Sequence, residues 1–311
     1  MTEDADVQYT HETAPTQFVQ AGDIRFAYRR FGPRGGIPLL LLNYFAAHMD
    51  NRDPKLTNGF AAEHDVILVD YPGIGRSSGE APSTVAALTN QCVAFCRAID
   101  LTHLDVVGFS LGGAIAQQFG AAYPDIVTRI ILLGSGPQGG EGMVFGDLSV
   151  DELDDVPALL MKAFFTPSEA SQAAGRAYVE RLKSRVDDRD TSVSKQSALA
   201  QLAALREWGT IPPSDRFAML SKIHHPTLIV HGNKDVVLMP INAFLMAEHL
   251  PNAQLIVYPD ASHGAQSQHA EIFLEHAALF LTDRTGCGAG RDDGERGQHR
   301  APGSLKVIPP L

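Results

Sequence analysis

The sequence predicts an α/β fold in which a mostly parallel sheet is flanked by helices and carries an inserted helical lid. Short, continuous apolar runs such as Leu39 to Asn43 and Val66 to Val69 are typical of strands buried on both faces of a sheet. Helical patterns separate these runs, and a repeated strand-then-helix order implies parallel strands joined by right-handed crossovers. The order breaks after Pro137 and resumes near Thr227, which indicates a helical insertion.

The composition excludes several classes of partner. The chain has 311 residues, 44% of them hydrophobic, which suits one large domain. Its net charge of −11 argues against a nucleic acid or an anionic membrane as partner. Met1 to Gln17 lacks the apolar core of a signal peptide, and no apolar run approaches the roughly 20 residues that span a bilayer. We therefore expect a cytoplasmic protein whose partner is a small-molecule substrate.

Residues 1–15 are expected to form a flexible N-terminus, followed by a hairpin. Phe18 to Ala21 and Ile24 to Phe31 have strand-like composition and flank a turn at Gly22-Asp23. Buried strands and helices then alternate as far as Pro137. Further strands are expected at 39–43, 66–69, 104–109 and 129–133, and helices at 54–63, from a cap at Ser83 to about 100, and from 111 to 123.

Residues 137–222 are predicted to be a helical lid between two parts of the core, residues 16–136 and 223–283. The lid has no buried-strand pattern and three helical patterns, at 151–165, 168–186 and 193–208. Ser168 is the expected N-cap of the second helix. The third helix is expected to place on one face Leu199, Leu202, Leu205 and Trp208. The alternative is that these helices are simply additional core.

Strand-forming sequence returns after the insertion. Strands are expected at 227–231 and 254–258, and helices at 242–250 and 268–281. Residues 284–311 are rich in Gly, Arg and Asp without a periodic apolar pattern, so we expect a disordered tail. The three cysteines are too few for a disulfide framework. Cys92 and Cys96 lie on a predicted helix, where we expect free thiols rather than a metal site.

A Gly-x-Ser-x-Gly motif lies between a strand and a helix in the segment Val106-Val107-Gly108-Phe109-Ser110-Leu111-Gly112-Gly113. In such an elbow the serine is held in a strained backbone conformation that exposes its hydroxyl above the sheet. Gly108 and Gly112 leave room for the turn, because a Cβ at either position would collide with it. The helix that starts at Leu111 adds partial positive charge where an anion would form. The motif therefore predicts Ser110 as a nucleophile rather than as part of an ordinary glycine-rich turn.

A serine hydroxyl needs a base, and the base needs an orienting group, before the serine can attack at neutral pH. Asp235 follows one of the later predicted strands, and His263 follows the last one. The C-terminal ends of parallel strands share one edge of the sheet, where ligands bind. We therefore expect Ser110, Asp235 and His263 to converge at that edge as a catalytic triad.

Three other residues compete for these roles. Asp70 also follows a strand, but we expect it to brace the loop 73–77. Asp260 lies three residues before His263 and is a second candidate for the orienting acid. His231 stands at the end of a strand, where we expect a structural role.

Together these motifs resemble those of α/β-hydrolases, in particular bacterial esterases and cofactor-free haloperoxidases or perhydrolases. The resemblance covers about residues 16–283 and rests on four segments: Gly108-Phe109-Ser110-Leu111-Gly112-Gly113, Asp70-Tyr71-Pro72-Gly73-Ile74-Gly75-Arg76-Ser77, His231-Gly232-Asn233-Lys234-Asp235 and Ser262-His263-Gly264. Serine, aspartate and histidine follow one another along the chain in the order known for that fold. The resemblance implies serine-dependent hydrolysis that uses neither a cofactor nor a metal.

The loop after the first buried strand departs from the pattern of these relatives, which usually have His-Gly-x there. This chain has Asn43-Tyr44-Phe45 instead. By position, the backbone N–H groups of Phe45 and Leu111 are the expected oxyanion donors, and the Tyr44 hydroxyl is an additional candidate. The residues expected to line the substrate pocket are Tyr44, Phe109 and Trp208.

Two functional hypotheses follow from these inferences. The first is a serine hydrolase that cleaves a small neutral ester, thioester or lactone through an acyl-enzyme on Ser110, with perhydrolysis as a subsidiary activity. The second is a non-catalytic protein that binds a ligand in the same pocket. A broken triad would favour the second, whereas all three residue types are present here. The lid offers mostly apolar side chains, which suits a short neutral acyl group.

Overall fold

The computed structural model describes residues 8–143, 145 and 150–282. Within these residues, eight strands form one sheet in the order β1-β2-β4-β3-β5-β6-β7-β8. The strands are β1 (Gln17–Ala21), β2 (Ile24–Phe31), β3 (Leu39–Leu42), β4 (Val66–Val69), β5 (Leu104–Phe109), β6 (Val127–Leu133), β7 (Thr227–Gly232) and β8 (Ala253–Tyr258). The β1–β2 and β2–β4 pairs are antiparallel and the other pairs are parallel. The predicted α/β class with a mostly parallel sheet is confirmed.

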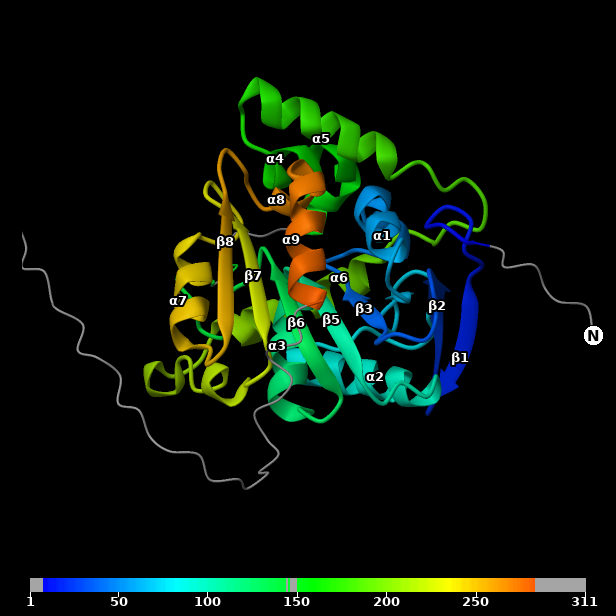
Figure 1. Ribbon diagram of the computed structural model, residues 1–311, viewed down its shortest axis with the longest axis horizontal. Coiled ribbons are helices and arrows are strands. Elements are labelled where there is room, and N and C mark those ends of the chain that lie inside the picture. The colour runs from blue at the N-terminus through cyan, green and yellow to red at the C-terminus, as the bar shows by residue number, and fades with distance from the viewer. Residues whose placement is uncertain (1–7, 144, 146–149, 283–311) are drawn as a thin grey trace, which may run out of the picture.

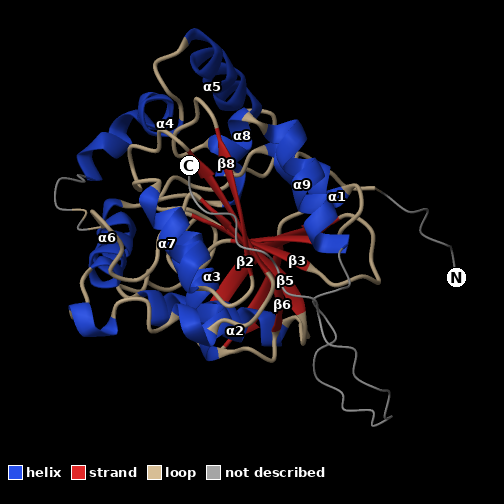
Figure 2. Ribbon diagram, turned by 60° about the vertical axis from the view of Figure 1, so that its left-hand side comes forward, coloured by secondary structure: helices blue, strands red, loops and turns tan. Residues whose placement is uncertain are grey.

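Helices cover both faces of the sheet (Figure 1 and Figure 2). They are α1 (Pro54–Ala61), α2 (Val85–Ala98), α3 (Leu111–Ala122), α4 (Val156–Phe164), α5 (Glu169–Arg181), α6 (Lys195–Gly209), α7 (Ile241–His249), α8 (Ala265–Gln268) and α9 (Ala270–Thr282). Short 3₁₀ helices are η1 (Met49–Asn51), η2 (Val150–Asp155), η3 (Pro213–Asp215) and η4 (Leu220–Lys222). The closing helix that the sequence predicts at 268–281 corresponds to α9, and the short helix α8, which is not predicted from the sequence, precedes it. Thr84, rather than Ser83, caps α2, since its hydroxyl accepts the Ala87 N–H at 3.1 Å.

Alternation of side chains along the strands divides the core into two layers. Leu40 and Leu42 of β3 pack in one layer with α2, α3 and α7, whereas Leu39 and Leu41 pack in the other with α1 and α9. All four leucines are buried, as expected for a strand that is covered on both faces. The C-terminal ends of the parallel strands share one edge of the sheet, and α4 and α5 lie across that edge (Figure 1).

The insertion between β6 and β7, predicted as a lid over residues 137–222, divides into two parts. α4 and α5 lie over the edge of the sheet, whereas α6 packs against α2 and contributes Trp208 to the core. Leu199 is 48% exposed, so it does not share the buried face of Leu202, Leu205 and Trp208. The predicted face is wrong at this position because Leu199 and Trp208 are about two and a half helical turns apart and lie on opposite sides.

Residues 8–15, which were expected to be flexible as part of 1–15, pack against the fold. His11 and Ala14 are buried. Nη1 of Arg185 donates at 3.0–3.1 Å to three backbone carbonyls, those of His11, Glu12 and Ala14. The expectation of flexibility is therefore wrong for these residues, because a buried guanidinium in the distant insertion satisfies their backbone.

Two further expectations concern the C-terminal part and the cysteines. The tail 284–311, with Cys287, lies outside the described residues. Cys92 and Cys96 are buried, free thiols on α2, as predicted, and burial raises the pKa of both. In the described part of the chain, no helix combines the length and the apolar character needed to cross a membrane.

Candidate active site

Ser110 connects the C-terminal end of β5 to the first turn of α3. Its φ is 55° and its ψ is −114°, a positive-φ conformation that costs about 1–3 kcal/mol for a residue with a side chain. The Ser110 N–H donates to the Leu133 carbonyl of β6 at 2.9 Å, which holds the turn against the sheet. A Cβ at Gly108 would lie 2.2 Å from the carbonyl oxygen of Gly112. The structure thus has both the strained serine and the need for glycine that the motif predicts.

Gly108→Ala is expected to destabilise the protein by about 2–4 kcal/mol, because the new methyl group meets backbone that cannot move without opening the elbow. Urea unfolding followed by circular dichroism measures this change. Gly36→Ala is the matched control, since a Cβ there has nothing within 4 Å and should alter the free energy of unfolding by less than about 0.5 kcal/mol. Equal stability of the two variants would contradict the close approach at the elbow.

His263 and Asp235 form a buried pair in the loops that follow β8 and β7. His263 Nδ1 lies 2.8 Å from Asp235 Oδ2. Oδ1 of the same carboxylate accepts the backbone N–H groups of Val237 and Leu238 at 2.8 and 2.9 Å. Burial opposes ionisation of Asp235, but the two nearby histidines hold its pKa well below the usual range. The carboxylate is therefore charged and fixed, and it keeps the proton of His263 on Nδ1, so that Nε2 can accept a proton.

Asp260, the other candidate for the orienting acid, contacts residues other than His263. It is exposed, and its carboxylate accepts hydrogen bonds from Thr166 Oγ1 at 2.7 Å and from Ser168 Oγ at 2.5 Å. Ser168 is also the N-cap of α5, as predicted, so Asp260 ties the loop after β8 to the start of this helix. Among the described residues, Asp235 is the carboxylate that contacts His263.

His231, expected to be structural, contacts the same acid. Its Nε2 lies 3.2 Å from Asp235 Oδ2 and 2.9 Å from the Leu238 carbonyl. A carbonyl can only accept, so Nε2 of His231 carries the proton. Asp235 Oδ2 therefore faces an N–H group from each of two histidines. The sequence shows that His231 ends a strand, but it does not show that the following loop folds back and brings the Asp235 carboxylate against the His231 ring.

Ser110 and His263 line one cavity of about 230 Å³ beneath α4. Its apolar lining is formed by Phe45, Ala46, Phe145, Leu153, Val156, Leu159, Leu160, Ala163, Phe164, Val193, Leu205 and Val237. The other polar lining residues are Tyr44, His48, Asn51 and Ser192. A mostly apolar cavity with a few polar groups is typical of a small-molecule site.

The three predicted pocket residues have different positions in the structure. Tyr44 lines the cavity, but its hydroxyl donates to the Asn51 carbonyl at 3.3 Å and is therefore not available as an oxyanion donor. Phe109 packs behind the site, with its ring centroid 5.1 Å from that of His263. Trp208 is buried in the core, and its indole N–H donates to a backbone carbonyl at 3.3 Å. Phe109 and Trp208 are thus core residues, and the prediction that they line the pocket is wrong.

Two segments carry the backbone N–H groups that are expected to bind an oxyanion. Leu111 begins α3, and Phe45 follows β3 and lines the cavity. The loop of Phe45 is held by buried Arg52, whose Nε donates to Asn43 Oδ1 at 2.7 Å, and by Tyr71, whose hydroxyl donates to the Asn43 carbonyl at 3.0 Å. The sequence carries no local signal for these contacts, which fix the loop although it lacks His-Gly-x.

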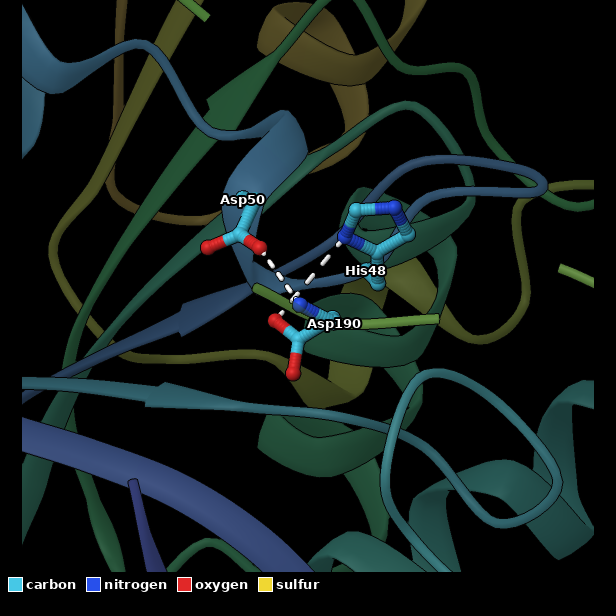
Figure 3. A group of neighbouring side chains, drawn as sticks. All are labelled: His48, Asp50 and Asp190. Atoms are coloured by element: carbon cyan, nitrogen blue, oxygen red, sulfur yellow. Dashed lines mark hydrogen bonds and ion pairs between the residues drawn. The ribbon is translucent and has the colours of Figure 1, made fainter. Parts of the chain in front are cut away.

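A buried ionic cluster lies beside the cavity. The side chains of His48, Asp50 and Asp190 lie next to one another (Figure 3), and one possible ligand atom from each lies within 4.8 Å of the others. Arg29 forms ion pairs with both carboxylates, and its Nη2 lies 2.9 Å from Asp190 Oδ2. The side chain of Arg185 is also close, with its Nε 3.7 Å from Asp50 Oδ1. Because two guanidinium groups already pair with these carboxylates, we interpret the cluster as an ion-pair network rather than a cation site.

Asp70 lies near this cluster and braces the loop 73–77, as the sequence predicts. Its carboxylate accepts the backbone N–H of Met49 at 2.8 Å and that of Arg76 at 3.2 Å. Burial raises the pKa of Asp70 well above its usual range and that of Asp190 to about 6. The carboxyl groups of Asp70 and Asp190 therefore bind to groups beside the cavity and, among the described residues, do not contact His263.

A serine at a strand–helix elbow, with a histidine–aspartate pair at the ends of two later parallel strands, is the arrangement of the α/β-hydrolase class. A family model described as alpha/beta hydrolase fold matches residues 37–270, so the chain belongs to this family.

Several proteins resemble this chain over most of its length. The solved structure of an alpha/beta hydrolase fold protein from Chitinophaga pinensis is 37% identical, covers 88% of this chain and 99% of its own, and has a TM-score of 0.84. A poly(3-hydroxyalkanoate) depolymerase from Ectopseudomonas oleovorans is 29% identical over 230 residues, which are 72% of this chain and 77% of the depolymerase. A 2-hydroxy-6-oxo-6-phenylhexa-2,4-dienoate hydrolase from Burkholderia cepacia is 29% identical over 239 residues, 72% of this chain and 79% of that protein.

Proposed function

We propose that this protein is a serine hydrolase that cleaves a small, neutral carboxylic ester, thioester or lactone. The observation that carries the proposal is the cavity shared by Ser110 and His263, together with the 2.8 Å contact between His263 and Asp235. A serine beside an oriented imidazole is the usual arrangement of an activated hydroxyl nucleophile. The hydrolases and the depolymerase among the relatives support the same reaction class.

In the proposed reaction, His263 Nε2 takes the proton of Ser110 Oγ as that oxygen attacks the carbonyl carbon of the substrate. The charge of Asp235 stabilises the imidazolium that forms. The tetrahedral intermediate then collapses, the leaving group receives the proton from His263, and an acyl group remains on Ser110. A water molecule, deprotonated by the same histidine, attacks the acyl-enzyme and releases the acid.

The negative charge on the carbonyl oxygen is assigned to the backbone N–H groups of Leu111 and Phe45. Leu111 stands at the N-terminus of α3, where the helix contributes partial positive charge. Phe45 reaches the cavity on a loop that Arg52 and Tyr71 hold in place through Asn43. Removal of one such donor typically lowers kcat by about 10²–10³.

Fluorophosphonate labelling tests the proposal directly. An activated serine attacks phosphorus, so intact-mass analysis should find one adduct per chain, and peptide mapping should place it on Ser110. A panel of acyl esters of increasing length then measures turnover. An unmodified mass, or an adduct on another serine such as Ser77, would contradict serine-dependent hydrolysis and favour a protein that only binds its ligand.

Neutral butyrate esters should be hydrolysed with a kcat/KM at least about tenfold higher than that of dicarboxylate monoesters of equal size, because an unpaired carboxylate is costly to bury. Among the described residues, no lysine or arginine lines the cavity. Ethyl butyrate and monoethyl succinate are a suitable pair, and acid release can be followed in a pH-stat. The reverse order of kcat/KM would mean that a cationic side chain reaches the substrate.

A further inference from the structure

Three of the polar lining residues, His48, Asn51 and Ser192, form a patch in the otherwise apolar cavity. The backbone N–H of His48 donates to Asn51 Oδ1 at 2.9 Å, so the two residues are adjacent. Ser192 follows Asp190, which lies next to the His48 ring (Figure 3). The proposed catalytic steps use none of these side chains. We call His48, Asn51 and Ser192 the polar patch.

The His48 ring presents a hydrogen-bond acceptor to the cavity. Its Nδ1 is turned towards Asp190 Oδ2 at 3.9 Å and, among the described residues, is buried without a hydrogen-bond partner. The ring is one of the groups that line the cavity, and Nε2 is its nitrogen that is not turned towards Asp190. Burial lowers the pKa of His48 to about 4, and the ring is therefore neutral at pH 7. The neighbouring carboxylate favours a proton on Nδ1, which leaves a lone pair on Nε2.

The rest of the polar patch supplies donors. Asn51 Oδ1 already accepts the backbone N–H of His48, so the NH₂ group of the Asn51 side chain is left as a donor. The Ser192 hydroxyl can donate or accept. An acceptor beside donors matches a group that is itself both donor and acceptor, and a hydroxyl is the simplest such group.

Charged ligands fit the polar patch less well. A carboxylate would find no cationic partner, because among the described residues no lysine or arginine lines the cavity. An ammonium group would need a carboxylate partner, but Asp50 and Asp190 are already paired with Arg29. The electrostatics of the cluster thus favour a neutral polar group.

We propose that the polar patch binds a free hydroxyl group of the substrate, so that the protein prefers hydroxy esters or hydroxyl-bearing lactones to their unsubstituted counterparts. The O–H group donates to His48 Nε2, and its oxygen accepts from Asn51 or Ser192. This inference rests on the proposed function and specifies the substrate class of the same site.

Matched ester pairs test the proposal. Ethyl hexanoate is compared with its derivatives that carry a hydroxyl on the third or on the terminal carbon, and butyl hexanoate with the ester whose butyl group ends in a hydroxyl. At least one hydroxyl-bearing ester should have a kcat/KM about tenfold or more above its counterpart, as expected when a buried polar site is left unpaired by the apolar analogue. In His48→Phe this ratio should fall to about one, because the acceptor is lost.

Two milder variants keep the test decisive if His48→Phe does not fold. His48→Gln retains an acceptor oxygen, so the ratio should stay above one, and Ser192→Ala should lower the ratio about threefold through the loss of one hydrogen bond. His103→Phe is the control, since His103 is exposed and precedes β5 at the opposite edge of the sheet. Its ratio should equal that of the unmodified protein.

The outcomes separate this inference from the proposed function. If Ser110 is labelled and esters are hydrolysed, but no hydroxyl-bearing ester is preferred, the inference is wrong and the proposed function stands. A preference that survives unchanged in His48→Phe would also overturn it. If Ser110 is not labelled and no ester is hydrolysed, the proposed function fails and this inference fails with it.

Discussion

Ser110→Ala is expected to lower the kcat of ester hydrolysis by about 10⁵–10⁶ and to abolish fluorophosphonate labelling. The reason is that Ser110 alone would form the covalent bond to the acyl group, so the reaction loses its nucleophile rather than a supporting contact. The fold should persist, because alanine removes a single oxygen and keeps the backbone of the elbow. Turnover is measured with ethyl butyrate and labelling by intact mass, with circular dichroism as the check on folding.

Ser83→Ala is the matched control for this experiment. Ser83 is exposed, and Thr84 rather than Ser83 caps α2. Labelling and turnover of this variant should therefore equal those of the unmodified protein. An adduct that persists in Ser110→Ala would show that another serine is the reactive one.

The sequence predicts the sheet well because its signals are local. β3 and β4 are continuous apolar runs, and a strand of this kind has few alternatives to burial on both faces. The turn at Ser110 is equally local, since the two glycines and the serine of the motif set its backbone. His263 and Asp235 could be placed at strand ends for the same reason, and the structure brings them within 2.8 Å of each other.

The residues around the site were harder to predict because their positions depend on distant segments. Trp208 is in the core since α6 packs against α2, a contact that helical spacing does not specify. The direction of the Tyr44 hydroxyl depends on Asn51 in the following loop. Arg52 holds the loop at Asn43, nine residues earlier in the chain. The sequence alone would place an arginine side chain at the surface.

Asp235→Asn is expected to lower the kcat by about 10²–10⁴ and to leave KM little altered, since Asp235 contacts histidine rings rather than the cavity. The carbonyl oxygen of an asparagine can keep the hydrogen bonds from Val237 and Leu238 only if its NH₂ group takes the place of Oδ2. That NH₂ group then meets the N–H of His231 and must donate to Nδ1 of His263. The proton of His263 moves to Nε2, where it prevents the ring from accepting the proton of Ser110.

Asp260→Asn distinguishes this explanation from a general effect of charge near the site. Asp260 accepts hydrogen bonds from two hydroxyl groups, and an asparagine oxygen can still accept one of them. Its kcat should therefore fall by less than about tenfold, because the tautomer of His263 is unaffected. Both variants lose one negative charge, and Asp260 lies on the same loop as His263, so a loss confined to Asp235→Asn has to come from the direct contact of Asp235 with the imidazole. An inactive Asp260→Asn beside an active Asp235→Asn would assign the wrong acid to His263, and circular dichroism of both variants ensures that neither result reflects unfolding.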